Sequence, residues 1–224
     1  MINNAQPKNH TKVILITLLA TAAFFFMAMY FMVLKPLQQS HHLQDVKIDG
    51  VVLPKGQVVS GFNFTDTHGS AFTKEELKGH WTMMFFGFTN CGMVCPTTMA
   101  ELNQMYKTLQ RELPDNKLPK IVMISVDPDR DSIERMNEYV TTFNTNFIGA
   151  RAEIAETVAL EKQLHIAAAK IEADGEGNNH YTINHTADIL LVNPNGEVQA
   201  FMSFPHKAAQ MVKDYKLVLT AFNS

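Results

Sequence analysis

Residues 81–102 read WTMMFFGFTNCGMVCPTTMAEL, and this stretch decides the fold. It opens with a continuous apolar run from Trp81 to Phe88, the pattern of a strand buried on both faces of a sheet. A turn containing Cys91 and Cys95 follows, and Pro96 is well placed for the first turn of a helix. The stretch therefore predicts a buried strand, a turn with two thiols, and a helix that begins beside them.

The rest of the chain continues this alternation of strands and helices. We expect a strand at 121–126, helices from 133 (capped by Asp131 or Ser132), at 154–164 and at 207–222, an exposed loop at 174–179, and hairpins at 51–64 and 186–202, the latter with its turn at 193–196. This order predicts an α/β, thioredoxin-like fold with an amino-terminal hairpin and insertions over residues 50–224, built on a mostly parallel sheet.

A long apolar segment precedes this domain. Residues 13–34 carry no formal charge, and as a helix they would extend about 33 Å, enough to cross a membrane. A cleaved signal peptide is the alternative, but its apolar region is usually shorter, about 7–15 residues, and ends at a small-residue cleavage site. We therefore expect one transmembrane anchor at 13–34, a cytoplasmic tail at 1–12 and a polar tether at 35–49.

The flanking charges predict the orientation of the anchor. Lys8 and Lys12 precede it and Lys35 alone follows closely, so the positive-inside rule places the amino terminus in the cytoplasm. Twelve residues leave no room for an organelle-targeting segment, which favours a bacterial inner (cytoplasmic) membrane. The domain would then face the periplasm or exterior, where paired thiols tend to oxidise unless they are kept reduced or bind a metal.

The charge of the domain argues against nucleic-acid binding. Three of the 19 lysine and arginine residues flank the anchor, so the remaining chain has 16 basic and 22 acidic side chains, a net charge of −6. It contains no basic stretch that could follow a phosphate backbone.

The two cysteines, four positions apart, carry the chemistry. A helix amino terminus favours thiolate, and two inert buried cysteines have no reason to cluster there. Dithiol redox exchange and soft-metal binding both remain open, although redox enzymes of this fold typically use Cys-x-x-Cys. Two thiolates and one imidazole would suit Cu(I), whereas tetrahedral zinc lacks an obvious fourth ligand.

His185 is the best placed of nine histidines to be a third ligand. It stands at the entry to the first strand of the late hairpin, a loop that in a thioredoxin-like sheet faces the cysteine-bearing helix. We expect the other histidines to be solvated, exposed or distant from the thiols, with His206 among the exposed ones. Position alone does not make His185 a ligand, since histidines are more often structural or surface groups.

Three segments resemble the SCO/SenC family of copper chaperones. They are residues 87–102 (GFTNCGMVCPTTMAEL), residues 124–131 (ISVDPDRD), and His185-Thr186 followed by a strand and the turn 193–196 (NPNG). The likeness spans roughly residues 62–202, and the three motifs occur in the family's order.

The resemblance implies a membrane-anchored, thioredoxin-fold protein that helps assemble the binuclear copper centre of cytochrome c oxidase. It implies that Cys91, Cys95 and His185 bind copper, as Cu(I) or Cu(II), and that the copper-bearing subunit of the oxidase is the partner. Other periplasmic copper chaperones and thioredoxin-like reductants are further expected partners.

The chain departs from the family pattern at two places. Gly92-Met93 replaces the usual Pro-Asp between the cysteines, and Asn184 replaces the Asp that commonly precedes the histidine. The first change removes a negative charge near the thiols, which eases their ionisation. We interpret Met93 as filling a hydrophobic turn rather than as a thioether ligand. The changes leave the three ligands intact and alter the surface that meets the partner.

Asp127 follows a predicted strand and has two interpretations. By resemblance it could orient a copper ligand or tune the charge of the site. Alternatively it forms an Asp-Pro turn with Arg130 as its ion partner, with Asp129, Arg130 and Asp131 shaping the turn and the helix cap.

A thiol–disulfide oxidoreductase that reduces the copper-ligand cysteines of a client, through Cys91 and Cys95, is the alternative function. The two functions can coexist, since a client's cysteines must be reduced before they bind metal. A peroxidase is disfavoured, because Gly92 stands where peroxiredoxins place a threonine. We expect a metallochaperone rather than an enzyme in the ordinary sense.

Overall fold

The computed structural model describes residues 8–34, 43, 45–172 and 181–223. An eight-stranded mixed sheet forms the centre of its domain, in the order β1-β10-β9-β4-β5-β6-β2-β3. The parallel strands are β4 (Thr82–Gly87), β5 (Lys120–Ser125) and β6 (Ile148–Arg151). Every residue of β4 is buried, and so is every residue of β5 after Lys120. The uninterrupted apolar runs are therefore buried strands, as predicted, because both of their faces are covered.

The sheet continues antiparallel on the far side of β4 and again beyond β6, so the predicted mostly parallel sheet is wrong: only the pairs β4–β5 and β5–β6 are parallel. On the far side of β4, β9 (Ile189–Val192) pairs with β4, β10 (Glu197–Met202) with β9, and β1 (Gly50–Val58) with β10. The predicted late hairpin is confirmed as β9–β10, and Gly196 in its turn has a φ of 80°. Glycine adopts this left-handed conformation without strain, which is why the Asn-Gly pair predicts the turn.

The predicted amino-terminal hairpin at 51–64 is wrong. β1 lies at one edge of the sheet, whereas β2 (Asn63–Asp66) pairs with β3 (Ala71–Thr73) and β6 at the opposite edge. Val59 and Phe62 in the connection are buried. Burial of these two side chains stabilises a path across the domain, so the chain does not reverse in a tight turn.

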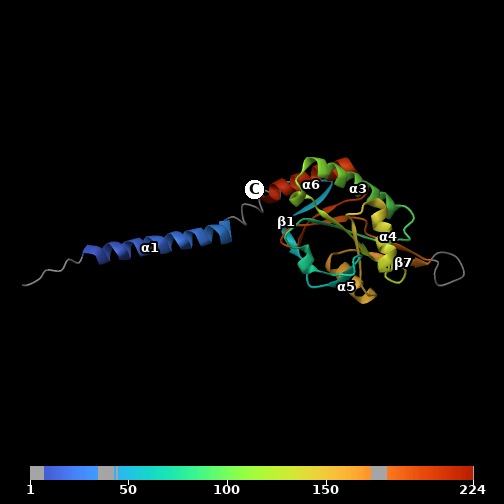
Figure 1. Cartoon of the computed structure of the whole chain (residues 1–224), viewed down its shortest axis with the longest axis horizontal. Coiled ribbons are helices and arrows are strands. Elements are labelled where there is room, and N and C mark those ends of the chain that lie inside the picture. Colours follow the sequence, from blue (N-terminus) through green and yellow to red (C-terminus); the bar gives the residue numbers. More distant parts are fainter. Residues whose placement is uncertain (1–7, 35–42, 44, 173–180, 224) are drawn as a thin grey trace, which may run out of the picture.

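Helices cover the sheet (Figure 1). They are α3 (Val94–Glu112), α4 (Ile133–Phe143), α5 (Ile154–Gln163) and α6 (Ala208–Asn223), with 3₁₀ turns η2 (Lys74–Leu77) and η3 (Asp115–Lys117). Figure 1 shows α3 and α6 side by side, with α5 on the other side of the domain. Ser132 caps α4, since its hydroxyl accepts a hydrogen bond from the Arg135 N–H.

A second, two-stranded sheet is missing from the prediction. β7 (Ala168–Glu172) and β8 (Tyr181–His185) pair antiparallel and form what we call the arm. The predicted exposed loop at 174–179 lies outside the described residues. His185 ends β8, and β9 begins only at Ile189. The expectation that His185 stands at the entry to a strand of the late hairpin is therefore wrong, because His185 is the last residue of the preceding strand, β8.

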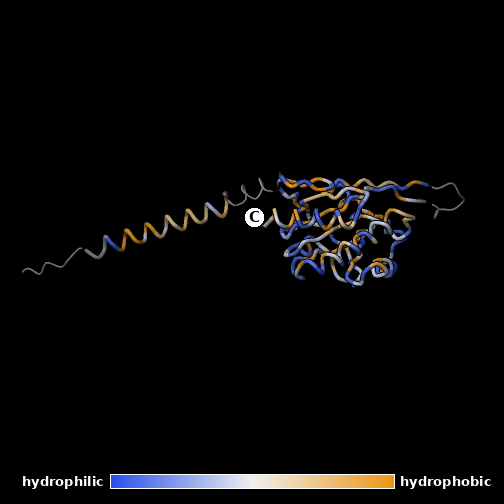
Figure 2. The backbone as a smooth tube through the Cα atoms, turned by 90° about the horizontal axis from the view of Figure 1, so that it is seen from above, coloured by the Kyte–Doolittle hydropathy of each residue, from blue (hydrophilic) through white to orange (hydrophobic). Residues whose placement is uncertain are grey.

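The amino-terminal segment is helical. α1 (Lys8–Met29) continues into a π-helical stretch, η1 (Tyr30–Leu34). The part from Lys12 to Val33 is 22 residues long, and its most apolar window is not buried at all. Figure 2 shows this segment as an almost wholly hydrophobic tube that lies apart from the domain. By length and composition the helix is a candidate membrane anchor.

Packing of the domain begins before β1. Leu43 is only 3 % exposed and belongs to the core, although it lies within the segment expected to be a tether. The backbone N–H of Asp49 donates a hydrogen bond to the buried carboxylate of Asp214 on α6, at 3.1 Å. The part of the tether nearest the domain is thus held against it.

Deletion of residues 1–34 is expected to leave the domain folded, because the apolar window of α1 buries nothing against it. Its thermal midpoint, measured by circular dichroism, should match that of the full chain in detergent, and the shortened protein should leave the membrane fraction.

Leu43→Ala in the shortened protein should lower the free energy of unfolding by about 2 kcal/mol, since a buried leucine side chain is lost. Equal stability of the Leu43→Ala protein would show that Leu43 is not part of the core.

Candidate metal centre

The two cysteines lie where β4 ends and α3 begins. Cys95 is in the first turn of α3 and fully buried, whereas Cys91 lies in the preceding loop and is partly exposed. Gly87 at the end of β4 permits the close packing, since a Cβ there would lie 3.1 Å from the Cys95 Sγ and 2.9 Å from the Phe85 ring. A side chain at position 87 would therefore displace the buried sulfur.

The Cys91 sulfur takes the place of a helix cap. Met93, at the N-cap position of α3, makes no capping hydrogen bond with its side chain. Instead the backbone N–H of Cys95 donates to the Cys91 Sγ at 3.3 Å. The first N–H groups of a helix have no partner within it, and the helix dipole favours negative charge there. The loop thus presents Cys91 where a thiolate is stabilised.

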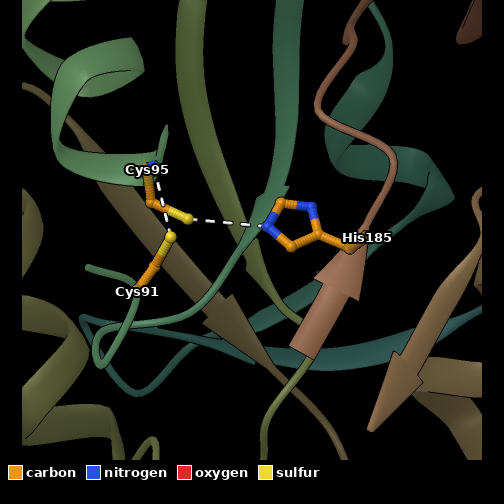
Figure 3. A group of neighbouring side chains, drawn as sticks. All are labelled: Cys91, Cys95 and His185. Carbon is orange, nitrogen blue, oxygen red and sulfur yellow. Dashed lines mark hydrogen bonds between the residues drawn. The ribbon is translucent and has the colours of Figure 1, made fainter. Parts of the chain in front are cut away.

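His185 completes the group from the end of the arm. Figure 3 shows its ring pointing toward the two sulfurs, and the Cys95 Sγ lies 3.6 Å from its Nε2. Its Nδ1 lies 2.9 Å from the Thr186 carbonyl oxygen, to which it donates, so Nε2 is the ring nitrogen that faces the thiols. The rings of Phe85 and Phe88 contact the imidazole edge-on.

The three side chains offer a compact set of soft and borderline metal ligands. The Sγ atoms of Cys91 and Cys95 and a ring nitrogen of His185 all lie within 4.8 Å of one another. The predicted ligands are thus brought together, although 90 residues separate Cys95 from His185. Two sulfurs and one imidazole at this spacing can hold a metal that accepts low coordination.

A family model described as SCO1/SenC matches residues 52–220 of the chain, most of its length. The chain belongs to the SCO1/SenC family. It is 29 % identical over 163 residues to the mitochondrial SCO2 homologue of Mus musculus, a match covering 73 % of this chain and 63 % of the mouse protein. It is 26 % identical over 211 residues to the SCO2-like protein RP587 of Rickettsia prowazekii, covering 93 % and 97 % of the two chains.

Solved SCO structures have the same fold. The structure of Bradyrhizobium japonicum ScoI with copper bound matches with a TM-score of 0.62 and 29 % identity, over 71 % of this chain and 98 % of that one. Arabidopsis thaliana ScoI with copper bound matches with a TM-score of 0.66 and 24 % identity, over 73 % and 99 %. The domain of this SCO1/SenC protein is therefore thioredoxin-like, as the order of its elements predicts.

The loop that carries Cys91 is braced by a buried carboxylate. Asp131 accepts hydrogen bonds from the backbone N–H and the hydroxyl of Thr89, the latter at 2.5 Å, and from the Ser125 hydroxyl at 2.7 Å. Arg135 in turn donates to the Thr89 hydroxyl oxygen at 2.8 Å. Burial raises the pKa of Asp131, and the hydroxyl donors partly offset this.

Sequence reasoning missed this brace and assigned Asp131 to a turn or helix cap, whereas Ser132 is the cap. One signal was available. Asp131 follows β5, whose carboxyl end lies beside that of the parallel strand β4, where the cysteine loop starts.

Asp127 contacts the arm. It forms the predicted ion pair with Arg130 and also accepts a hydrogen bond from the Tyr181 hydroxyl at 2.6 Å. Arg130 donates to the Tyr181 carbonyl at 2.9 Å, and its guanidinium lies 3.6 Å from the centre of the tyrosine ring. We call these three residues the latch. Because Tyr181 and His185 begin and end the same strand, the latch joins the turn after β5 to the strand that carries the imidazole.

Two other side chains differ from expectation. Met93 is 76 % exposed, so it does not fill a hydrophobic turn. His206 is 7 % exposed rather than on the surface. Its Nε2 lies 2.9 Å from the Ala187 carbonyl oxygen, which it meets as a donor. His206 therefore holds the segment between the arm and β9, outside the group of possible ligands.

The thiols are ionised unequally. The pKa of Cys91 is lowered to about 4, chiefly because the Cys95 thiol donates a hydrogen bond to it; the His185 side chain adds to this effect, and burial opposes it. The pKa of Cys95 is raised, first by its hydrogen bond to Cys91 and then by burial. The reduced pair thus holds one thiolate, on the more exposed sulfur, and one proton, on the buried one.

Alkylation of the reduced, metal-free protein should show this difference. With its pKa near 4, Cys91 is fully thiolate at neutral pH, and the thiolate is lost only as the pH falls through about 4. Its rate with iodoacetamide should therefore be constant from pH 5.5 to 7, whereas an ordinary thiol gains about tenfold per pH unit there. Mass spectrometry should find Cys95 unmodified. A rate for Cys91 that rises steadily over this range would contradict the assignment.

Tyr181→Phe should loosen the arm. The change removes the hydroxyl that bonds the buried Asp127 and keeps the ring that Arg130 covers, so local opening of β8 should increase about tenfold or more. Hydrogen exchange of residues 181–185 measures it. Tyr139→Phe is the matched control, because the buried Tyr139 hydroxyl has no hydrogen-bond partner among the described residues. Equal exchange in the two variants would refute the latch.

Proposed function

We propose that this SCO1/SenC protein is a membrane-anchored copper chaperone that binds copper through Cys91, Cys95 and His185 and delivers it to the binuclear copper site of cytochrome c oxidase. The observation that carries the proposal is the convergence of the three ligand atoms within 4.8 Å of one another, beyond the carboxyl end of β4. It is supported by the bound copper in the Bradyrhizobium japonicum structure, which is 29 % identical to this chain.

The ionisation of the free pair suits Cu(I) as cargo. Cu(I) is soft, prefers thiolate, and accepts two or three ligands. The Cys91 thiolate is ready to bind it, and the Cys95 thiol loses its proton when its sulfur binds, so uptake releases about one proton. His185 would offer Nε2 as the third ligand, and an imidazole nitrogen also suits Cu(II). The latch, through Asp127, would act on the site by holding the arm in place.

The proposed location follows from the anchor. One helix in the inner membrane would hold the domain in the periplasm or exterior, close to a membrane-bound oxidase. The copper-bearing subunit of the oxidase is the proposed client, and periplasmic copper chaperones or thioredoxin-like reductants are proposed suppliers of metal and electrons. The domain boundaries expected from the sequence, an anchor at 13–34 and a copper-binding domain at 50–224, form part of this proposal.

A thiol–disulfide oxidoreductase is the second candidate. The Cys91 thiolate lies beside the buried Cys95 thiol, the arrangement that a dithiol reductant needs for attack and resolution. A related structure, 23 % identical, concerns a disulfide switch in BsSco, described as a member of a family of cytochrome c oxidase assembly proteins. A reductase would use both cysteines and would not require His185.

Copper loading separates the two functions. The full chain in detergent, reduced and loaded without oxygen, should bind about one copper per chain. Cys91→Ser and Cys95→Ser should abolish tight binding. His185→Ala should weaken it by more than about tenfold and change the Cu(II) spectrum, because one of three ligands is lost. His68→Ala is the control, since His68 is exposed and remote from the group. Absence of tight copper in the reduced wild type would overturn the chaperone and favour the reductase.

A further inference from the structure

A cavity of about 520 Å³ opens beside the metal centre. α5 and the segment that leads into β7 form one part of its wall, and the end of the arm, including His185 itself, forms another. Three consecutive alanines, residues 167–169, line it, and their short side chains leave the space open. A group bound in this cavity would therefore lie directly against one of the three ligands.

Glu161, on α5, lines the cavity with a carboxyl that lacks a partner. The residue is only 6 % exposed, yet no side chain or backbone group among the described residues donates a hydrogen bond to its carboxyl, and no cation pairs with it. Lys162 beside it also lines the cavity but is exposed and makes no ion pair with it. Burial raises the pKa of Glu161 to about 7, and only the nearby His185 opposes this.

An unpaired buried carboxyl is costly, and buried polar side chains are almost always hydrogen-bonded. Glutamate is also a poor choice for filling a core position, since it is rarely buried without a partner. The missing partner is therefore expected from outside this chain, and the cavity gives it access to the carboxyl. A hydrogen-bond donor with positive charge suits the carboxylate best, because charge-assisted hydrogen bonds are stronger than neutral ones.

The surroundings favour a cation as well. Two thiolates, one Cu(I) and a neutral imidazole together carry a net negative charge, and the chain beyond Lys35 has a net charge of −6. A basic group would be attracted to this region and would neutralise the carboxylate next to the loaded centre.

We propose that the cavity binds a lysine or arginine side chain of the protein with which this chain exchanges copper, with Glu161 as its charged contact. The inference rests on the proposed function and specifies the partner: a protein that carries a basic side chain close to its own copper-binding thiols. Docking in the cavity places those thiols beside His185 and the partly exposed Cys91, the two ligands that a competing thiol can reach first.

The first test probes the cavity without copper. The full chain in detergent, with labelled alanine methyls, is titrated with n-propylguanidinium, and n-propylurea serves as the neutral probe of equal shape. Saturable shifts at the methyls of residues 167–169 are expected with the cation alone. Glu161→Gln should weaken this binding by about tenfold or more, since a charge-assisted contact is lost. Glu156→Gln, an exposed position of the same helix, is the matched control and should bind as the wild type does.

Either of two outcomes would overturn the cavity as a cation site. One is equal shifts with the cation and the urea, and the other is unchanged binding by Glu161→Gln. Copper per chain is measured on the same samples and should stay at about one in both variants. A protein that binds no copper yet binds the cation would refute the proposed function alone, so the two failures can be told apart.

The second test addresses the partner. Cu(I) transfer from the loaded protein is timed to two reduced dithiol peptides, identical except that lysines or glutamines flank the cysteines. The wild type and Glu156→Gln should prefer the lysine peptide by about tenfold, and Glu161→Gln should largely lose that preference. If the guanidinium binds but Glu161→Gln keeps the full preference for lysine, the cavity binds small cations and its proposed role in docking a partner is refuted.

Discussion

The approach of His185 to the buried Cys95 sulfur is the contact on which the arrangement of this domain depends. This contact, 3.6 Å long, joins the first turn of α3 to the end of β8, a strand of the separate two-stranded sheet. Because β4 and β5 are parallel, the cysteine loop and the turn containing Asp127 both lie at the carboxyl ends of these strands. The latch then reaches from that turn to Tyr181 at the start of β8, and His185 closes the circuit at the end of the same strand. The strand that carries His185 is thus held by the turn after β5, and the buried Cys95 sulfur is contacted by His185.

Two buried carboxyls at this end of the strands have different partners. Asp131 is surrounded by hydroxyl and amide donors, so it shapes the loop of Cys91 through hydrogen bonds and without an ion partner. Asp127 is neutralised by Arg130 and shares that arginine with Tyr181. Neither is a member of the compact group of metal ligands among the described residues. Both carboxyls therefore position other parts of the site, the loop of Cys91 and the arm. The amino terminus of α3 stabilises the Cys91 thiolate.

Much of the fold could be predicted because the central strands and helices have clear signals in their own local sequence. β4 and β5 are apolar without alternation, Ser132 and Pro96 mark helix starts, and Asn195-Gly196 marks a hairpin. The edge strands and the arm could not be predicted in this way. Ala168 to Glu172 shows no alternation of burial and packs mainly on its partner strand, so its conformation is set by pairing rather than by its own side chains.

The same distinction applies to the site. The two cysteines are visible in the sequence because the motif is continuous. His185 could be placed only by combining position with a family resemblance, since its contact with Cys95 is non-local. The brace at Asp131, the burial of His206 and the isolation of Glu161 depend on side chains that meet in three dimensions, and no spacing along the chain marks them.

The arm also has a consequence for how such a site can be adjusted over evolution. His185 is fixed from two sides, by Tyr181 at the start of its strand and by His206, which grips Ala187 just beyond it. Both contacts lie outside the central sheet, so substitutions there act first on how readily the imidazole leaves. The residence time of a metal can thereby change with a smaller change in the melting temperature than substitutions in the central strands would cause. A domain with all three ligands on its central strands would have to trade one property against the other.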